Sequence, residues 1–226
     1  PDSEDYGDFE PPSNKTLGGR TFEELEGWDD DPKYYKDMVE YHDKIVGKII
    51  EKVKTAGISE NTIIIYLGDN GTPIEVCSMM HKHTQVCGGK GLTNDRGTHV
   101  PMMCQWDGKI TKGMISKDLI DSVDILPTIL EIAEIKNDND FKIDGRSFLP
   151  QLLGEKGNPR DWVFFHFEPM TPRNKTYSRF LRTKSWKLYE TGEMFDLNKD
   201  PDEKNPITKN NDYAESFSER KKLQPI

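Results

Sequence analysis

Residues 62–72 read TIIIYLGDNGT, and this stretch decides the fold class. The run from Thr62 to Leu67 is rich in β-branched residues and lacks polar alternation, which favours a strand buried on both faces. Two polar residues, Asp69 and Asn70, follow directly and are set between glycines. Ligands of α/β proteins bind beyond the carboxyl ends of the strands, so this strand end is a candidate binding site.

The two polar side chains are hard oxygen donors. A carboxylate and an amide carbonyl suit calcium or magnesium better than zinc or copper. Asp-Asn-Gly is also an ordinary turn sequence, so a turn without a metal is the alternative. Because calcium takes about six to eight oxygens, further ligands would have to come from elsewhere.

The segments around this strand predict an α/β unit. Apolar residues recur at helical spacing from Tyr34 to Thr55, which predicts an amphipathic helix. VPMMCQW (100–106) predicts a second buried strand. Residues 71–99 show no sustained period and are expected to form a loop. Ser116 and Asp124 are the candidate N-caps of two helices that follow.

The last third of the chain has a different pattern. Aromatic and apolar segments at 162–167, 179–189 and 194–197 alternate in part and predict an antiparallel sheet of half-buried strands. We therefore expect an α/β fold with a mostly parallel sheet flanked by helices and a small antiparallel C-terminal subdomain. The expected units are an irregular lead-in (1–33), the α/β part (34–150), the antiparallel subdomain (151–206) and a polar tail (207–226).

Composition excludes several classes of function. The 226 residues carry a formal net charge of -9, which argues against a nucleic-acid partner. No apolar run approaches the roughly 20 residues of a membrane span. The cysteines, Cys77, Cys87 and Cys104, form no C-x-x-C pair, so free thiols are favoured over a structural zinc site. A bridge between Cys77 and Cys87 in an oxidising compartment is the alternative.

A glycine-rich stretch, GGKGLTNDRGTHVP (88–101), holds the candidate anion-binding residue. Lys90 is a movable point charge with glycines on both sides, and it suits an anionic oxygen. An ordinary solvated loop lysine is the alternative. His81 and His83 lie between the strand end and Lys90 and are candidate substrate contacts. His166 stands among aromatic residues in a predicted strand and is a further candidate.

Five blocks follow one another in a familiar order: TIIIYLGDNGT, VCGGKGLTNDRGTHVPMMCQWDGKI, DLIDSVDILPTILEIA, DGRSFLPQLLG and MFDLNKDPDEKNPI. Together they resemble the sulfatase family, which is similar to alkaline phosphatase in fold. The likeness is to the C-terminal portion of such an enzyme and covers roughly residues 34–206. A lone D-N-G would be a weak signal, whereas five blocks in order are a strong one.

The resemblance implies roles for the candidate residues. Asp69 and Asn70 resemble the family's calcium ligands, and magnesium is the alternative ion. Lys90 resembles the lysine that contacts a sulfate oxygen, where a cation stabilises developing charge. A sulfated small molecule or carbohydrate is the implied substrate, in part contacted by His81, His83 and His166. A periplasmic, secreted or lysosomal location is implied as well.

The family's nucleophile is a formylglycine made from the cysteine or serine of C/S-x-P-x-R, and no such motif occurs in these 226 residues. We expect that motif upstream and expect the chain alone to be inactive. One alternative is a phosphate or phosphonate ester hydrolase of the same superfamily, and another is a non-catalytic module that binds an anion or a partner. Unpaired sheet edges would also favour self-association.

Overall fold

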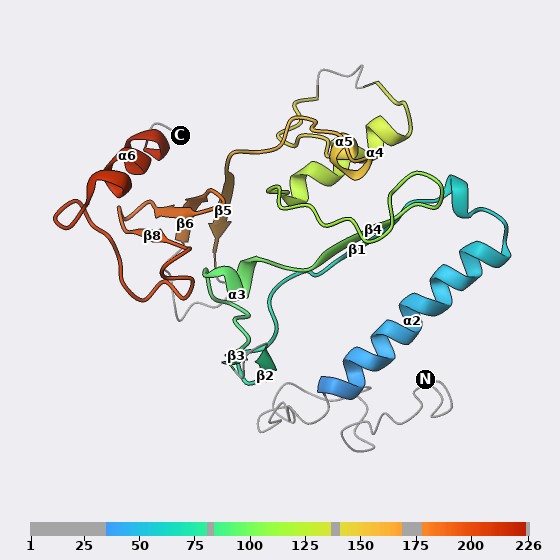
Figure 1. Ribbon diagram of the computed structural model, residues 1–226, viewed down its shortest axis with the longest axis horizontal. Coiled ribbons are helices and arrows are strands. Elements are labelled where there is room, and N and C mark those ends of the chain that lie inside the picture. The colour runs from blue at the N-terminus through green and yellow to red at the C-terminus, as the bar shows by residue number, and fades with distance from the viewer. Residues whose placement is uncertain (1–34, 81–83, 137–140, 169–177, 225–226) are drawn as a thin grey trace.

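The computed structural model describes residues 35–80, 84–136, 141–168 and 178–224 (Figure 1). Its helices are α2 (Tyr35–Thr55), α3 (Asp95–Thr98), α4 (Ile125–Ile132), α5 (Leu149–Leu152) and α6 (Ala214–Leu223), with 3-10 turns at Ser59–Asn61 and Ser122–Asp124. Its strands are β1 (Ile64–Leu67), β2 (Cys77–Met80), β3 (Thr84–Cys87), β4 (Met102–Gln105), β5 (Val163–Phe167), β6 (Ser178–Arg182), β7 (Trp186–Tyr189) and β8 (Met194–Asp196).

The predicted helix and both predicted strands of the first part form. Helix α2 lies along one side of the molecule, beside the ribbon of β1 and β4 (Figure 1). The C-terminal part of the helix faces this ribbon, since Ile50 and Val53 line a small hollow together with Ile64. The ring of His42 packs edge-on against Tyr66 of β1, with ring centroids 5.5 Å apart. The predicted helix is therefore confirmed, but its expected apolar stripe is covered only in part, since Ile45 and Val53 are half-buried whereas Met38 and Ile49 are exposed.

The expected parallel sheet is not found among the described strands. β1 pairs with β4 in antiparallel register, with Ile64 opposite Gln105 and Leu67 opposite Met102. A parallel neighbour needs a crossover, usually a helix of several turns. The chain between β1 and β4 contains the β2–β3 hairpin and the four-residue α3 instead, and it returns in the opposite direction. Strand β1 is also half-buried to exposed along its length, whereas burial on both faces was expected.

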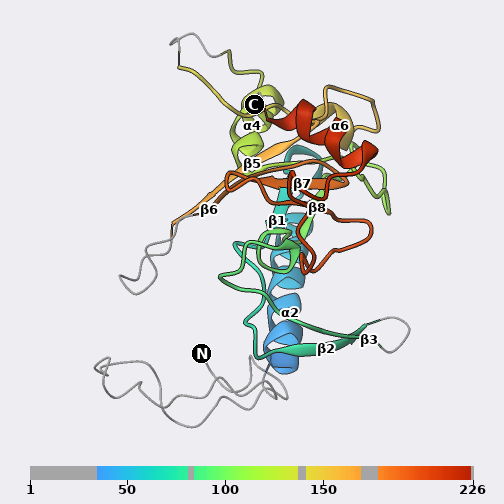
Figure 2. The ribbon, with the colours of Figure 1, turned by 90° about the vertical axis from the view of Figure 1, so that its left-hand side faces the viewer.

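The segment 71–99 is more regular than the sequence indicated. β2 pairs with β3, and Figure 2 shows this hairpin projecting from the body beside α2. Cys77 lies directly opposite Cys87 and the two form a disulfide, so the free-thiol interpretation was wrong for this pair. Cys104 is a free thiol, and partial burial raises its pKa.

Ser116 does not begin a helix. Its hydroxyl accepts a hydrogen bond from the amide of Asp118 at 3.2 Å and so closes a local turn. Asp121 is the N-cap of the 3-10 turn, because its carboxylate accepts from the amide of Val123 at 3.3 Å, and Asp124 is the N-cap of α4 as predicted. The side chain of Asp124 accepts in return from the amide of Asp121 at 2.9 Å. This capping box starts the 3-10 turn that leads into α4.

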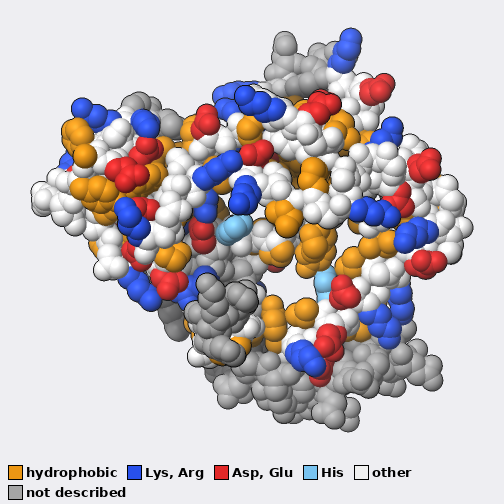
Figure 3. All heavy atoms as spheres, viewed as in Figure 1, with side chains coloured by type: hydrophobic (Ala, Val, Ile, Leu, Met, Phe, Trp, Pro, Cys, Tyr) orange, Lys and Arg blue, Asp and Glu red, His pale blue; other side chains and the backbone are white. Residues whose placement is uncertain are grey.

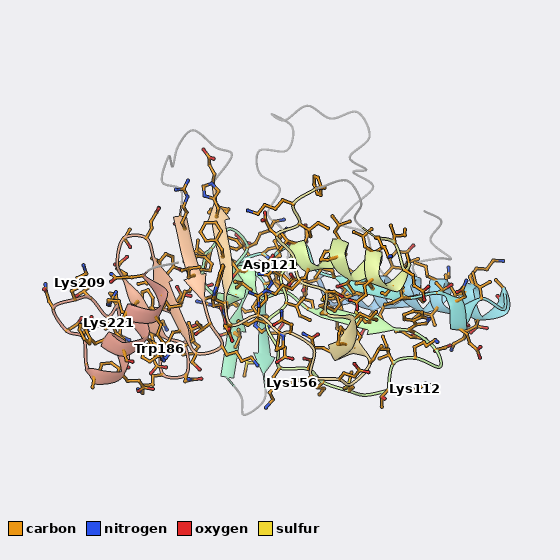
Figure 4. The ribbon with its side chains drawn as sticks, turned by 90° about the horizontal axis from the view of Figure 1, so that it is seen from above. Lys112, Asp121, Lys156, Trp186, Lys209 and Lys221 are labelled. Carbon is orange, nitrogen blue, oxygen red and sulfur yellow. A yellow bond between two sulfur atoms is a disulfide. The ribbon has the colours of Figure 1, made fainter. Side chains whose placement is uncertain are left out.

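The predicted C-terminal antiparallel sheet is confirmed. Its strand order is β5-β6-β7-β8, with every neighbouring pair antiparallel. The core beside it is formed by Trp186, Leu188, Met194 and Leu223. In Figure 4, Trp186 lies at the same end of the molecule as Lys209 and Lys221.

The burial of β7 and the packing of α6 in this layer differ from expectation. Strand β7 is buried on both faces from Trp186 to Leu188, so the prediction of half-buried strands was wrong for it. The reason is that α6, from the expected polar tail, covers one face through Leu223 and the loop at 93–95 covers the other. Arg220 of α6 is 2% exposed and donates to the carbonyls of Gly192 and Ile207 at 2.6 and 2.8 Å.

The surface carries apolar side chains as well as charges. Figure 3 shows one face, hollowed near its middle, with hydrophobic side chains gathered around the hollow. Large exposed apolar residues include Met38 and Ile49 on α2 and Met103 on β4. In the described part of the chain, none of the helices combines the length and the apolar character that a membrane crossing would require.

Candidate metal and anion site

The candidate metal ligands lie directly after β1. Asp69 is exposed and Asn70 is half-buried. The carboxylate of Asp69 accepts a hydrogen bond from the amide of Asn70 at 2.9 Å, which fixes one of its oxygens toward the turn. The other oxygen and the side-chain carbonyl of Asn70 have the donor chemistry that a hard cation prefers.

A close backbone contact joins this turn to the end of the glycine-rich stretch. The amide of Gly71 donates to the carbonyl of Gly97 at 3.0 Å. A Cβ atom placed on Gly71 would lie 2.0 Å from the carbonyl oxygen of Arg96. A residue with a side chain therefore cannot occupy this position without moving one backbone away from the other.

The candidate anion ligand is tied to the same turn. The carbonyl of Thr72 accepts from the amides of Gly89 and Lys90, each at 2.9 Å. A Cβ atom placed on Gly88 would lie 2.2 Å from this carbonyl, so this approach also depends on a glycine. The backbone of Lys90 is thus bonded to Thr72, which lies two residues after Asn70 in the sequence. The side chain of Lys90 is exposed to solvent.

The disulfide closes the loop between these two segments. Cys87 immediately precedes Gly88, whose amide donates to the carbonyl of Val76 at 2.9 Å. Cys77 follows Val76, so the disulfide and this hydrogen bond clamp the base of the hairpin together. The clamp sets where the chain enters the stretch that carries Lys90.

The C-terminal sheet holds the other side of that stretch. Arg182 of β6 forms a two-point ion pair with Asp95, at 2.6 and 3.0 Å. Burial disfavours the charged form of Asp95, but the hydrogen bonds and charge of Arg182 outweigh it, and the pKa of Asp95 is lowered. This pair couples α3, five residues after Lys90, to the sheet.

The remaining candidate residues are the three histidines named as substrate contacts. His81 and His83 fall outside the described residues. His166 is exposed on β5, where its Nδ1 accepts from the Nε of Arg179 at 2.9 Å. Its Nε2 lies 3.8 Å from a carboxylate oxygen of Glu168. The structure therefore places His166 on the sheet, bonded to a neighbouring strand.

Asp69 and Asn70 have the type of donor atom that calcium binds, but they are too few to fill its coordination shell. Asp69 and Asn70 supply hard oxygens at a strand end, as calcium or magnesium requires. Within the described ranges, no group of three or more His, Cys, Asp or Glu side chains could hold a metal ion. A hard cation held by two such donors can bind an anion, provided that further ligands complete its shell.

The sequence did not reveal the buried residue that contacts the stretch carrying Lys90. Lys187 was interpreted as part of a half-buried strand, yet its side chain is 0% exposed. The WKLY sequence of β7 alternates apolar residues with a lysine and a tyrosine, which is typical of a half-buried strand and gave no sign of this burial.

Known proteins similar to this chain are sulfatases. A sequence model of the Sulfatase family matches residues 3–135, and a model described as "N-sulphoglucosamine sulphohydrolase, C-terminal" matches residues 89–224. An uncharacterized sulfatase of Escherichia coli (strain K12), YdeN, is 36% identical over 151 residues, which are 63% of this chain and 26% of that protein. The N-acetylgalactosamine-6-sulfatase of Mus musculus is 30% identical over 167 residues, which are 71% of this chain and 32% of that protein.

The fold is also similar to that of solved sulfatases. The structure of BT4656 in complex with D-glucosamine-2-N,6-O-disulfate superposes with a TM-score of 0.64 at 23% identity. The superposition covers 85% of this chain and 38% of the solved one. By sequence, the chain spans about a quarter to a third of the length of the two curated relatives described above.

Proposed function

The chain belongs to the sulfatase family, and on that premise we propose that it is the C-terminal part of a sulfuric ester hydrolase. One observation carries the proposal: the carbonyl of Thr72 binds the amides of both Gly89 and Lys90. This contact brings a predicted sulfate-binding lysine to the strand end that carries two oxygen donors. The arrangement suits a tetrahedral anion held between a cation and an ammonium group.

Each residue has a proposed role. Lys90 donates from its ammonium to a sulfate oxygen and stabilises the negative charge that develops there as the ester bond breaks. Asp69 and Asn70 would hold calcium together with ligands from outside the described residues. A bound calcium ion would polarise the sulfate group. His81, His83 and His166 stay candidate contacts for the rest of the substrate.

A sulfated carbohydrate is the proposed substrate class. This rests on relatives named for N-acetylgalactosamine-6-sulfate and on a solved neighbour that holds a disulfated glucosamine. The proposed location is periplasmic, secreted or lysosomal, and the disulfide between Cys77 and Cys87 supports an oxidising compartment. The 226 residues contain no C/S-x-P-x-R motif, so we expect no turnover of an aryl sulfate by these residues alone.

Anion titration tests the proposal without needing turnover. Inorganic sulfate added to the ¹⁵N-labelled chain in the presence of calcium is expected to shift the amide signals of Gly89, Lys90 and Gly91. Lys90→Met should weaken this binding about tenfold or more, because a hydrogen bond to a charged group is lost. Lys112→Met, which removes an exposed lysine from another turn, is the matched control and should leave the affinity unchanged.

Two results would contradict the proposal. Sulfate shifts that are equal in Lys90→Met and in the unmodified chain would remove Lys90 from the site. Inorganic phosphate binding far more tightly than sulfate would favour a phosphate ester as the substrate.

A further inference from the structure

Lys187 is a fully buried lysine in the C-terminal sheet. Its side chain is 0% exposed, and its ammonium lies 3.9 Å from the centroid of the Phe180 ring. Burial disfavours the charged form and lowers the pKa of Lys187, although the hydrogen bond and charge of Glu203 act in the opposite direction. A methionine would fill the same space without the cost of burying a charge. The polar contacts of the ammonium are therefore the feature to explain.

Those contacts point at the stretch that carries Lys90. The ammonium of Lys187 donates to the backbone carbonyl of Thr93 and to Glu203, the latter at 2.8 Å. The hydroxyl of Tyr189, two residues along the same face of β7, contacts the hydroxyl of Thr93 at 3.0 Å and Glu203 at 2.5 Å. Thr93 is thus held at its carbonyl and at its side chain by one buried cluster.

Thr93 lies inside a short, closed stretch of backbone. The amide of Leu92 donates to the carbonyl of Gly89 at 2.8 Å, and the amide of Gly97 donates to the carbonyl of Asn94 at 2.9 Å. The stretch is fastened to the strand end by Lys90 and by Gly97, and to the sheet by Thr93. A displacement of Thr93 therefore acts on a short stretch whose other end, at Lys90, is bonded to the carbonyl of Thr72.

We propose that Lys187, together with Glu203 and Tyr189, is a positioning residue that fixes the backbone of Lys90 against the strand end that carries Asp69. The consequence for anion binding rests on the proposed function, whereas the consequence for backbone order does not. Lys187 does not touch the anion and acts through Thr93.

Arg220 provides a matched control within the same subdomain. It is also a buried cation, 2% exposed, paired with the acidic residue Asp212 at 2.8 Å and bonded to the backbone carbonyls of Gly192 and Ile207. Its contacts lie between α6 and the loops next to β8. Lys187→Met and Arg220→Met therefore both remove a buried, paired cation, but only Lys187→Met breaks a contact with Thr93.

The test measures hydrogen exchange at the amides of Gly89 and Lys90, together with sulfate affinity and resistance to urea. Both variants should lose resistance to urea. In Lys187→Met the two amides should exchange about tenfold faster or more relative to global unfolding, and sulfate should bind at least several-fold more weakly. In Arg220→Met the exchange at these amides should follow global stability alone. Equal exchange at these amides in the two variants, after that correction, would overturn the proposal.

A second variant keeps the test decisive if Lys187→Met does not fold. Lys187→Met/Glu203→Gln also removes the carboxylate that would be left buried without its partner, and so should fold better than the single variant. It still lacks the contact with the carbonyl of Thr93, so fast exchange at Lys90 is expected, and normal protection there would refute the positioning role. If the unmodified chain binds no sulfate while the exchange pattern is as expected, the proposed function fails and the positioning role stands.

Discussion

Gly71 is the position where a single added methyl group should separate the two halves of the candidate site. In the structure its amide donates to the carbonyl of Gly97 at 3.0 Å. The Cβ atom of Gly71→Ala would lie 2.0 Å from the carbonyl oxygen of Arg96 and 2.9 Å from the Cα atom of Gly97. Both neighbours are backbone atoms, so a side-chain rotation cannot relieve the clash.

The cost follows from this geometry. The two backbones must move apart by about 1 Å or more to restore an ordinary contact, which breaks the hydrogen bond between Gly71 and Gly97. The lost hydrogen bond is worth about 0.5–1.5 kcal/mol. Overpacking of this kind costs about 1–3 kcal/mol. We therefore expect Gly71→Ala to lower the free energy of unfolding by about 1.5–4.5 kcal/mol.

Urea unfolding followed by circular dichroism measures this change, and Gly47→Ala is its control. A Cβ atom on Gly47, in the exposed part of α2, meets nothing within 4 Å. That substitution should raise stability by about 0.5–1 kcal/mol, because alanine favours a helix over glycine. The two Gly→Ala changes are thus expected to have opposite signs.

Hydrogen exchange at the amide of Gly71 locates the effect. Protection of this amide should fall in Gly71→Ala and stay unchanged in Gly47→Ala. If Gly71→Ala is as stable as the unmodified chain and its residue 71 amide remains protected, the close contact between the two segments does not exist in solution.

Two further predictions concern the disulfide and the ion pair with Asp95. Reduction of Cys77–Cys87 should lower the free energy of unfolding by about 2–3 kcal/mol in the chain-entropy account and should speed hydrogen exchange at the Gly88 amide. Urea titration and hydrogen exchange with and without reductant measure both effects. Unchanged exchange at Gly88 would contradict the role of the disulfide as a clamp. Since the pKa of Asp95 is lowered in the folded state, the unfolded state binds more protons near pH 4, and the stability from the Arg182 pair is lost as pH falls below about 4. Acid titrations of the unmodified chain and of Asp95→Asn should therefore differ in slope in that window, and identical slopes would exclude this pair as the cause.

Local periodicity predicted the elements whose pattern is complete within one segment. The apolar spacing on residues 35–55 predicted the helix, although none of its residues is buried, and the aromatic segments predicted the C-terminal sheet. The direction of pairing between β1 and β4 could not be predicted in this way, because it depends on the path of the 34 residues that connect them. The disulfide was left open for a similar reason: cysteine spacing does not show that Cys77 and Cys87 face one another across a hairpin.

For the candidate site as well, some features could be predicted from the sequence and others could not. Asp69, Asn70 and Lys90 were predicted from residue chemistry and from resemblance to a family. What joins them is a backbone group, the carbonyl of Thr72, which no side-chain pattern reveals. Lys187 was missed because its partner, the carbonyl of Thr93, lies 94 residues away in the chain. Contacts made by backbone groups across long sequence distances carry little signal in a single sequence.

Calcium titration of the ¹⁵N-labelled chain tests the central claim most directly, since it asks whether Asp69, Asn70 and Lys90 belong to one site. We predict weak binding, in the millimolar range or above, because two donors cannot complete a shell of about six to eight oxygens. The shifts should centre on the Asn70 side chain and the Gly71 amide, extend to Lys90, vanish in Asp69→Asn and persist in the control Asp43→Asn. Tight, saturable binding that survives Asp69→Asn, or shifts that leave Asn70 and Lys90 unaffected, would contradict the account.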